Sequence, residues 1–348
     1  MWLGARTCHL LWEDGLINVI TGATGLLGSH IAEQLAQLGR PVRALVRSSS
    51  DVAFLRGLGV EIVAGDLGNM QSLRAAFAGA DTVYHCASRV GDFGTWKLFR
   101  AEVVETTRTV MEACRTMAVG RVLHVSSVAV YGLRPRIPAG GLTEEQPLRR
   151  RLRFGDHYGL AKIQSEEVAR TLVPGVTIVR PTWVFGPRDR HGLPRLMKAL
   201  RGGWVSLVGS GANLLNIVHA RDVASGAILA ANHPEARGQI YNLCSEGEIT
   251  QRQFLDALAD AEGLPRVTRK APLRLAYWGG FVSEIIARVL RFRRAPFISR
   301  YSVSRLSRPA AYRIDKARTQ LGWSPHVKIL DGLRETLDWL RQFEAKPT

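Results

Sequence analysis

From Leu16 to about residue 181, short apolar runs alternate with segments whose apolar residues recur at helical spacing. This alternation favours a parallel sheet covered by helices on both faces, because each helix carries the chain back to begin the next parallel strand. The apolar runs predict strands at Leu16–Ile20, Val42–Val46, Val60–Val63, Asp81–Cys86, Arg121–Val125 and Val176–Arg180. Helices are predicted from Leu27 to Leu38, ended by Gly39, and from His157 to Leu172. The predicted fold class is α/β, with a doubly wound parallel sheet.

After residue 182 the alternation loosens, and glycine and proline become frequent. A strand-like piece at Asn216–His219 and a helix from Ala220 to about Ala231 are expected to return to the main sheet. We therefore expect a sheet-forming core made of residues 15–182, 216–245 and 311–343. We expect a smaller, partly helical C-terminal lobe, which binds the substrate, made of residues 183–215 and 246–310.

The 348 residues carry a net charge of +17, almost all of it from arginine. Codon bias explains such an excess as well as does attraction to an anion, whether a phosphorylated cofactor, a nucleic acid or a membrane surface. The four cysteines form no CxxC pair and have no histidine at metal-ligand spacing, so no metal site is expected. This cysteine pattern favours a reducing compartment, and we expect a cytoplasmic protein.

The sequence contains no apolar run of the about 18 residues that a membrane-spanning helix needs. Met1–Asp14 lacks the apolar core and cleavage site of a signal peptide, so we interpret it as a short extension or a misplaced start codon. Leu273–Phe292 mixes large apolar residues with arginines. A helix that packs over an apolar pocket has this composition, and we favour that interpretation. An amphipathic helix in peripheral contact with an anionic membrane is the alternative.

Three glycines, Gly22, Gly25 and Gly28, follow the first predicted strand and open the first predicted helix. Glycine lets the backbone turn tightly and approach a pyrophosphate, while the helix N-terminus offers N–H donors and positive potential. In this setting between a strand and a helix, the glycines predict a Rossmann-type dinucleotide site rather than a simple turn.

The residues that end the second and third predicted strands bear on which cofactor is bound. An acid at the end of the second strand would bind the adenosine ribose hydroxyls and select NAD. Here Arg47 follows Val46, and no acid occurs before Asp51. Arg47 could pair with a 2′-phosphate, which favours NADP; an arginine on a solvated loop is the alternative. Asp66, at the end of the third strand, is placed to meet the adenine amino group.

Tyr158 and Lys162 lie four residues apart in the predicted helix after the fifth strand, so they share one helix face. An ammonium about 4 Å from a phenol, at an effective dielectric of about 20, contributes about 4 kcal/mol. That is enough to lower the phenol pKa by about three units from its usual value near 10. The pair therefore predicts general acid–base chemistry at a carbon–oxygen bond.

The fifth strand ends in Val125-Ser126-Ser127. A hydroxyl at this strand end could hydrogen-bond the reacting oxygen and orient it for hydride transfer. We select Ser127 for this role and keep Ser126 in reserve.

The order of these motifs resembles the extended short-chain dehydrogenase/reductase (NAD-dependent epimerase/dehydratase) superfamily, over nearly the whole chain to about residue 343. The resemblance is carried by the glycine pattern, Gly65-Asp66-Leu67, Ser127-x3-Tyr131-Gly132, Tyr158-x3-Lys162, Arg180-Pro181-x3-Phe185-Gly186-Pro187, Val218-His219-x2-Asp222-Val223 and Lys316-Ala317-x3-Leu321-Gly322-Trp323-x-Pro325. It implies Ser127, Tyr158 and Lys162 as the catalytic set, and a homodimer formed through two long helices beside the sheet.

A narrower resemblance links Tyr84–Ser88, Gly91–Trp96 and the arginine-rich late lobe to the 3β-hydroxysteroid and sterol-4-carboxylate dehydrogenase branch. The expected cofactor is NAD(P), with NADP favoured. Its expected contacts are Gly22, Thr24, Gly25, Leu26, Leu27, Gly28, Arg47, Asp66, Leu67, Ala87, Tyr158, Lys162 and Pro181. One departure concerns Val103, which replaces an asparagine that in relatives positions structure and water behind the active-site lysine. A valine side chain cannot relay a proton there.

Several other polar residues are given structural interpretations. His85 and His219 are expected to be hydrogen-bonded residues at the edge of the sheet, and Asp222 is expected to cap the helix that follows it. Arg149, Arg150, Arg151 and Arg153 precede Tyr158 and are interpreted as a solvated basic loop. Contact of these arginines with an anionic substrate is the alternative.

These observations predict an NAD(P)-dependent oxidoreductase that transfers a hydride between nicotinamide and a secondary alcohol or ketone of a sterol-like or other hydrophobic substrate. A nucleotide-sugar epimerase or dehydratase, which begins with the same oxidation, is the first alternative. A non-catalytic, cofactor-bound RNA-binding protein is the second. Nucleic acid is disfavoured because the sequence shows no aromatic–basic RNA motif.

Overall fold

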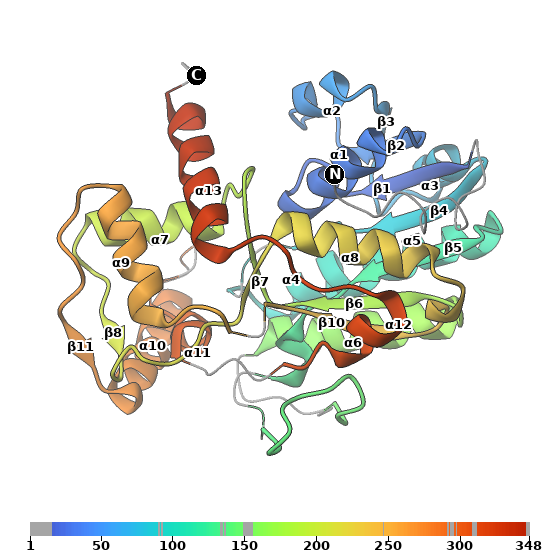
Figure 1. Ribbon diagram of the computed structural model, residues 1–348. Coiled ribbons are helices and arrows are strands. Elements are labelled where there is room, and N and C mark those ends of the chain that lie inside the picture. The colour runs from blue at the N-terminus through green and yellow to red at the C-terminus, as the bar shows by residue number, and fades with distance from the viewer. Residues whose placement is uncertain are drawn as a thin grey trace.

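The computed structural model describes residues 16–89, 91, 93–132, 135, 137–148, 156–245, 247–290, 292, 296, 298–307 and 312–345. Within them, seven parallel strands form one sheet in the order β10-β6-β5-β4-β1-β2-β3 (Figure 1). The strands are β1 Ile17–Thr21, β2 Val42–Val46, β3 Glu61–Ala64, β4 Ala80–His85, β5 Arg121–Val125, β6 Thr177–Pro181 and β10 Ile240–Leu243. The six predicted strands and the doubly wound fold are confirmed. The strand order reverses between β1 and β4, which is where such sheets bind ligands.

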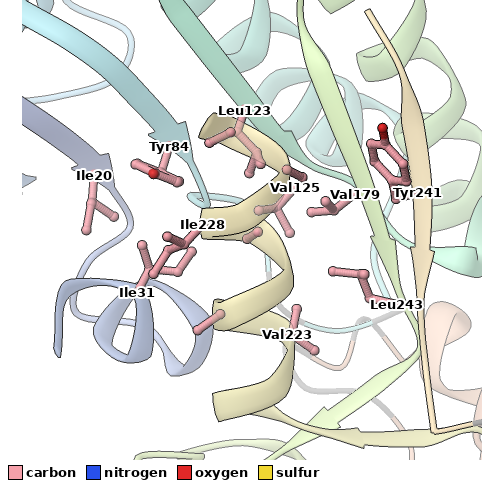
Figure 2. Packing of buried hydrophobic residues seen from close by; sticks show 14 of the residues in the cluster. Ile20, Ile31, Tyr84, Leu123, Val125, Val179, Val223, Ile228, Tyr241 and Leu243 are labelled. Carbon is pink, nitrogen blue, oxygen red and sulfur yellow. The ribbon is translucent and has the colours of Figure 1, made fainter. Parts of the chain in front are cut away.

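Helices cover both faces of the sheet. The helices around the sheet are α1 Leu26–Gln37, α2 Ala53–Gly57, α3 Met70–Phe77, α4 Trp96–Phe99, α5 Thr106–Thr116, α6 His157–Leu172, α8 Ala220–Asn232 and α12 Asp315–Leu321. Helices α1 and α8 pack together on one face, and α3, α5 and α6 cover the other. Figure 2 shows Val223 and Ile228 of α8 in one cluster with apolar residues of the strands, among them Tyr84, Val125 and Leu243.

Successive residues of each central strand enter opposite cores, because side chains alternate along a strand. Ile20, Tyr84, Leu123 and Val179 face α1 and α8. Their neighbours Val19, Val83, Val122 and Ile178 join the cluster beneath α3, α5 and α6. Both faces are therefore buried, which explains why the strands read as continuous apolar runs in the sequence.

The remaining elements lie largely to one side of the sheet (Figure 1). They are β7 Trp183–Phe185, α7 Gly192–Arg201, β8 Leu207–Val208, β9 Ile217–His219, α9 Gln251–Ala261, β11 Lys270–Ala271, α10 Leu273–Val289, α11 Arg300–Ser307 and α13 Ile329–Glu344. A second apolar cluster joins Leu193 of α7, Phe254 of α9 and Leu333 of α13. Among the helices of the described residues, none is long and apolar enough to cross a membrane.

The strand at Ile217–His219 was expected to join the main sheet, but it does not. It pairs with β7 in a two-stranded sheet, with Trp183 opposite Ile217. The free edge of β6 is instead taken by β10, with Ile240 opposite Ile178. Helix α12 packs against α8 and β10, whereas α13 packs against α9 and β9. The division of the chain into a core and a substrate lobe stays a prediction.

Candidate active site

The glycine turn between β1 and α1 leaves little or no room for a side chain at Gly22, Gly25 and Gly28. Gly22 has φ +72°, and a Cβ added to it would lie 2.7 Å from the backbone of Ala87. A Cβ at Gly28 would collide with the Gly22 carbonyl oxygen, and one at Gly25 would lie 3.2 Å from the same oxygen. The first N–H groups of α1 have no partner within the helix, so they face this turn as anion donors. The turn therefore fits a dinucleotide pyrophosphate.

The other expected cofactor contacts lie at the same edge of the sheet. Thr24 is in the glycine turn, and Leu26 and Leu27 form the first turn of α1. Leu67, Ala87 and Pro181 stand at the carboxyl ends of β3, β4 and β6, respectively. The carboxyl ends of neighbouring parallel strands meet at one edge of the sheet, so these residues share one side of the fold.

Arg47 and Asp66 stand beyond the carboxyl ends of two paired strands. Val46 of β2 pairs with Ala64 of β3, which brings the ends of these strands side by side. Both Arg47 and Asp66 are exposed. An Asp66 carboxylate oxygen accepts a hydrogen bond from the Gly68 N–H at 2.7 Å, which orients the carboxylate.

Tyr158 and Lys162 occupy the first two turns of α6. The Lys162 side chain is buried and donates a hydrogen bond to the Val125 carbonyl at 3.0 Å, so its ammonium lies against the end of β5. The half-buried Tyr158 ring makes edge contacts with Phe99, at 6.2 Å between centroids, and with Tyr301, at 5.9 Å. Phe99 ends α4, and Tyr301 comes from α11.

Burial lowers the pKa of Lys162 from 10.5 to about 8, although the nearby Glu166 and Cys86 act in the opposite direction. The side chain is therefore charged at neutral pH and titrates close to it. An ammonium held in a buried position interacts more strongly with a neighbouring phenol than an exposed one does, because solvent screens it less.

The two serines after β5 differ in surroundings. Ser127 caps the short 3₁₀ turn Val128–Tyr131, where its hydroxyl accepts a hydrogen bond from the Ala129 N–H at 3.2 Å. It lines a pocket. Ser126 is buried in the strand pairing, and its N–H donates to the Val179 carbonyl at 2.8 Å. Ser127 is thus the hydroxyl that a ligand in the pocket can reach.

The pocket is lined by residues that are far apart in the sequence. Its lining includes Ser127, Thr182, Trp183, Tyr301, Ser304 and Arg305. The Arg305 guanidinium lies 3.9 Å from the Trp183 ring and 5.6 Å from the Tyr301 ring. The buried Thr182 hydroxyl has no hydrogen-bond partner among the described residues. The pocket thus combines aromatic walls with a cation and polar groups.

The two histidines have structural contacts. His85 Nδ1 lies 2.8 Å from the Thr21 hydroxyl, and burial lowers the pKa of His85 to about 3. His219 accepts a hydrogen bond from the Arg221 N–H at 3.2 Å and so caps α8. The sequence predicted that Asp222 caps this helix, and this prediction is wrong, because His219 is the cap. Its carboxylate instead accepts the N–H groups of residues 326 and 327, each at 3.1 Å.

Val103 lies in a π-helical turn at Arg100–Glu105, immediately before α5. Its side chain is buried in an apolar cluster with Phe99 and Ala161. Its carbonyl accepts a hydrogen bond from the Thr107 hydroxyl at 2.7 Å. A buried hydroxyl lies one helical turn after Val103, at Thr107, and its Oγ1 is also 3.3 Å from His85 Nε2.

Sequence reasoning missed the residues that α11 adds to the pocket, above all Tyr301 and Arg305. It also missed a buried ion pair beneath the site. Arg180 of β6 contacts both carboxylate oxygens of Glu166 in α6, at 2.9 and 2.6 Å. The charge of an arginine within a buried strand was the available signal, because such a charge needs a partner. The arginines at 149–151 and 153 lie outside the described residues.

Known proteins resemble this chain along most of its length. The profile of the NAD dependent epimerase/dehydratase family matches residues 18–244. The 2-alkyl-3-oxoalkanoate reductase of Shewanella oneidensis is 28% identical, over 90% of this chain and 84% of its own. A ketoreductase of Stigmatella aurantiaca, acting on 4-hydroxy-2-methyl-3-oxo-4-farnesyl-3,4-dihydroquinoline-1-oxide, is 32% identical, over 91% of this chain and 95% of its own.

A sterol relative and a solved structure extend the comparison. The decarboxylating sterol-4-alpha-carboxylate 3-dehydrogenase of Mus musculus is 28% identical, over 91% of this chain and 89% of its own. The crystal structure of gox2253 superimposes with a TM-score of 0.74 at 27% identity, covering 94% of this chain and 98% of that one. The similarity thus spans the seven-stranded sheet and the elements beside it.

Proposed function

Because the chain belongs to the NAD dependent epimerase/dehydratase family and is an NAD(P)-dependent oxidoreductase of the extended short-chain type, we propose that it acts on a hydrophobic secondary alcohol or its ketone. The substrate proposed first is sterol-like or has a long alkyl chain. The observation that carries the proposal is the pocket that Ser127 lines together with the aromatic residues Trp183 and Tyr301.

We propose chemical roles for Ser127, Tyr158 and Lys162, supported by the contact of Tyr158 with the pocket residue Tyr301. Tyr158 exchanges a proton with the reacting oxygen, and Ser127 hydrogen-bonds that oxygen to fix its orientation. Lys162 lowers the phenol pKa by its charge and holds the ribose of the cofactor. The nicotinamide cofactor, when bound, supplies or accepts the hydride.

Arg305 is proposed to bind an anionic oxygen of the substrate close to the reacting carbon. The names of the three relatives all specify carbon 3, either as an oxo group or as the position of dehydrogenation. Each name also contains a second oxygen group, which is an alkanoate, a 1-oxide or a carboxylate. In this chain the guanidinium lines the same pocket as Ser127, supported by the Trp183 ring. A guanidinium binds a carboxylate through charge-assisted hydrogen bonds.

The substrate proposal is tested with a long-chain 2-alkyl-3-oxo acid, its methyl ester and the wild-type protein. We expect oxidation of the reduced cofactor with both compounds, followed by its absorbance. Arg305→Gln should lower kcat/KM for the acid about tenfold to a hundredfold, since a hydrogen bond to a charged group contributes about 1.5–3 kcal/mol. The ester should be affected much less.

The matched control is Arg269→Gln, which removes an exposed arginine of the lobe that does not line this pocket. It should leave both reactions unchanged. Equal losses for acid and ester in Arg305→Gln would contradict the carboxylate role. A wild-type protein that retains its cofactor without net oxidation would favour a sugar epimerase or dehydratase over the proposed reaction.

The cofactor preference proposed here is NADP, through Arg47. Arg47→Ala should weaken NADPH binding about tenfold and leave NADH binding nearly unchanged, because only NADPH carries the 2′-phosphate. Fluorescence titration with the two reduced cofactors measures both affinities. Arg56→Ala removes an exposed arginine of nearby α2 and controls for net charge. Tighter binding of NADH by the unmodified protein would refute this preference.

The pH dependence of ketone reduction should report on Lys162. Its lowered pKa means that its ammonium loses a proton as the pH rises through about 8, rather than near 10.5. Tyr158 then loses the positive charge beside it, so kcat/KM should decline above this pH. Lys162→Met, which carries no charge, should move the decline toward the ordinary pKa of a phenol, near 10, in whatever activity it retains. A wild-type profile that stays flat up to the ordinary lysine range would contradict the assignment.

A further inference from the structure

Helix α10 turns its apolar residues toward solvent. Leu275, Trp278, Val282, Ile286 and Val289 have exposed fractions of 67%, 64%, 52%, 50% and 73%. They recur every three or four residues, so they form one continuous stripe along the helix. An ordinary surface helix buries such a stripe in the core. Figure 1 places α10 beside α11, away from the seven-stranded sheet.

The opposite side of α10 packs against α11 and holds the polar contact. A Cβ added to the buried Gly280 would lie 2.8 Å from the Arg300 backbone nitrogen, so the backbones of α10 and α11 approach closely here. Glu284, the one acid of α10, is buried and accepts a hydrogen bond from Arg300 Nε at 3.0 Å. The exposed side of the helix consequently carries no negative charge.

The stretch of sequence that contains this helix is strongly basic. Between residues 265 and 307 the sequence holds ten arginines and lysines and the single acid Glu284. Arg274, at the start of α10, is exposed beside the apolar stripe. An exposed apolar stripe flanked by arginines is complementary to a surface that offers both hydrocarbon and negative charge.

We propose that α10 docks the protein on an anionic phospholipid membrane. The helix lies in the plane of the interface, with the stripe from Leu275 to Val289 among the acyl chains and the exposed Arg274 beside the lipid phosphates. The proposed docking does not depend on the reaction catalysed. For the proposed function, docking would bring the pocket residues Tyr301 and Arg305 close to the membrane, because they lie on α11, which packs on α10.

The test uses the full-length protein and vesicles of phosphatidylcholine, with or without phosphatidylglycerol. Sedimentation of the vesicles measures the bound fraction. We expect binding to the vesicles that contain phosphatidylglycerol, weakened by added salt. Trp278→Ser combined with Val282→Ser should lower the partition coefficient at least about tenfold, because two large apolar groups no longer leave water.

Trp204→Ser is the matched control, because Trp204 is 61% exposed elsewhere in the chain, between α7 and β8. It should leave vesicle binding unchanged. NADPH titration checks that each variant is folded. The proposal fails if the unmodified protein ignores the anionic vesicles, or if the double variant binds them equally well. It also fails if neither vesicle is bound and the double substitution converts a dimer into a monomer, since a second copy then covers the stripe.

Discussion

Tyr158→Phe is expected to lower kcat/KM for ketone reduction about a thousandfold, which lies within the range found for the loss of a positioned general acid. The phenylalanine ring keeps the contacts with Phe99 and Tyr301, so the fold and cofactor affinity should change little. The loss should therefore appear in kcat. Steady-state kinetics and NADPH titration of the same preparation separate the two effects.

Tyr241→Phe provides a control for the removal of a tyrosine hydroxyl. The Tyr241 hydroxyl lies in β10 and donates to Gln320 at 3.0 Å, so it does not belong to the pocket. Its removal should leave turnover unchanged. Activity of Tyr158→Phe within about tenfold of the unmodified protein would show that another group supplies the proton.

Glu166→Gln is expected to reduce the free energy of unfolding by about 3–5 kcal/mol, the usual cost of leaving a buried charge without its partner. The exposed fractions of the Arg180 and Glu166 side chains are 2% and 4%. Arg180 also donates to the Tyr131 hydroxyl at 3.0 Å, and that hydroxyl donates to Asn242 at 2.9 Å. The pair thus connects β6 and α6 to β10, and urea unfolding measures the loss.

The matched comparison is Asp331→Asn, the same change from acid to amide in an exposed pair with Arg334. Solvent screens this pair, so its loss should cost less than about 1 kcal/mol. If Glu166→Gln were no more damaging than Asp331→Asn, the buried pair would not stabilise the sheet edge. Substituting both Arg180 and Glu166 with apolar residues should recover part of the loss, because neither charge of this pair is then left buried without its partner.

The fold could be predicted from the sequence where local pattern determines structure. The six predicted strands are buried on both faces, so each appears as an apolar run. Strand β10 was not identified, because Asn242 interrupts its run. The amide of Asn242 is satisfied by the carbonyl groups of Leu142 and Arg313, far away in the sequence. Nothing near residue 242 signals those partners.

In the candidate site, too, the features set by local sequence could be predicted and those set by distant segments could not. The glycine turn and the Tyr158–Lys162 spacing are local, so the sequence alone placed them at the end of β1 and in α6. The pocket wall from α11 depends on packing between segments more than a hundred residues apart. Asp222 illustrates the limit: its position near a helix start predicted a cap, whereas its carboxylate binds N–H groups of a distant segment.

The late arrival of β10 in the chain matters while the protein is being synthesised. The ribosome synthesises β6 before the elements from β7 to α8, and residues 240–243 follow only afterwards. Until they emerge, the nascent sheet presents the β6 edge with its hydrogen-bonding groups unpaired. Another chain can pair with such an edge, so this interval is the period in which newly made molecules are most exposed to aggregation.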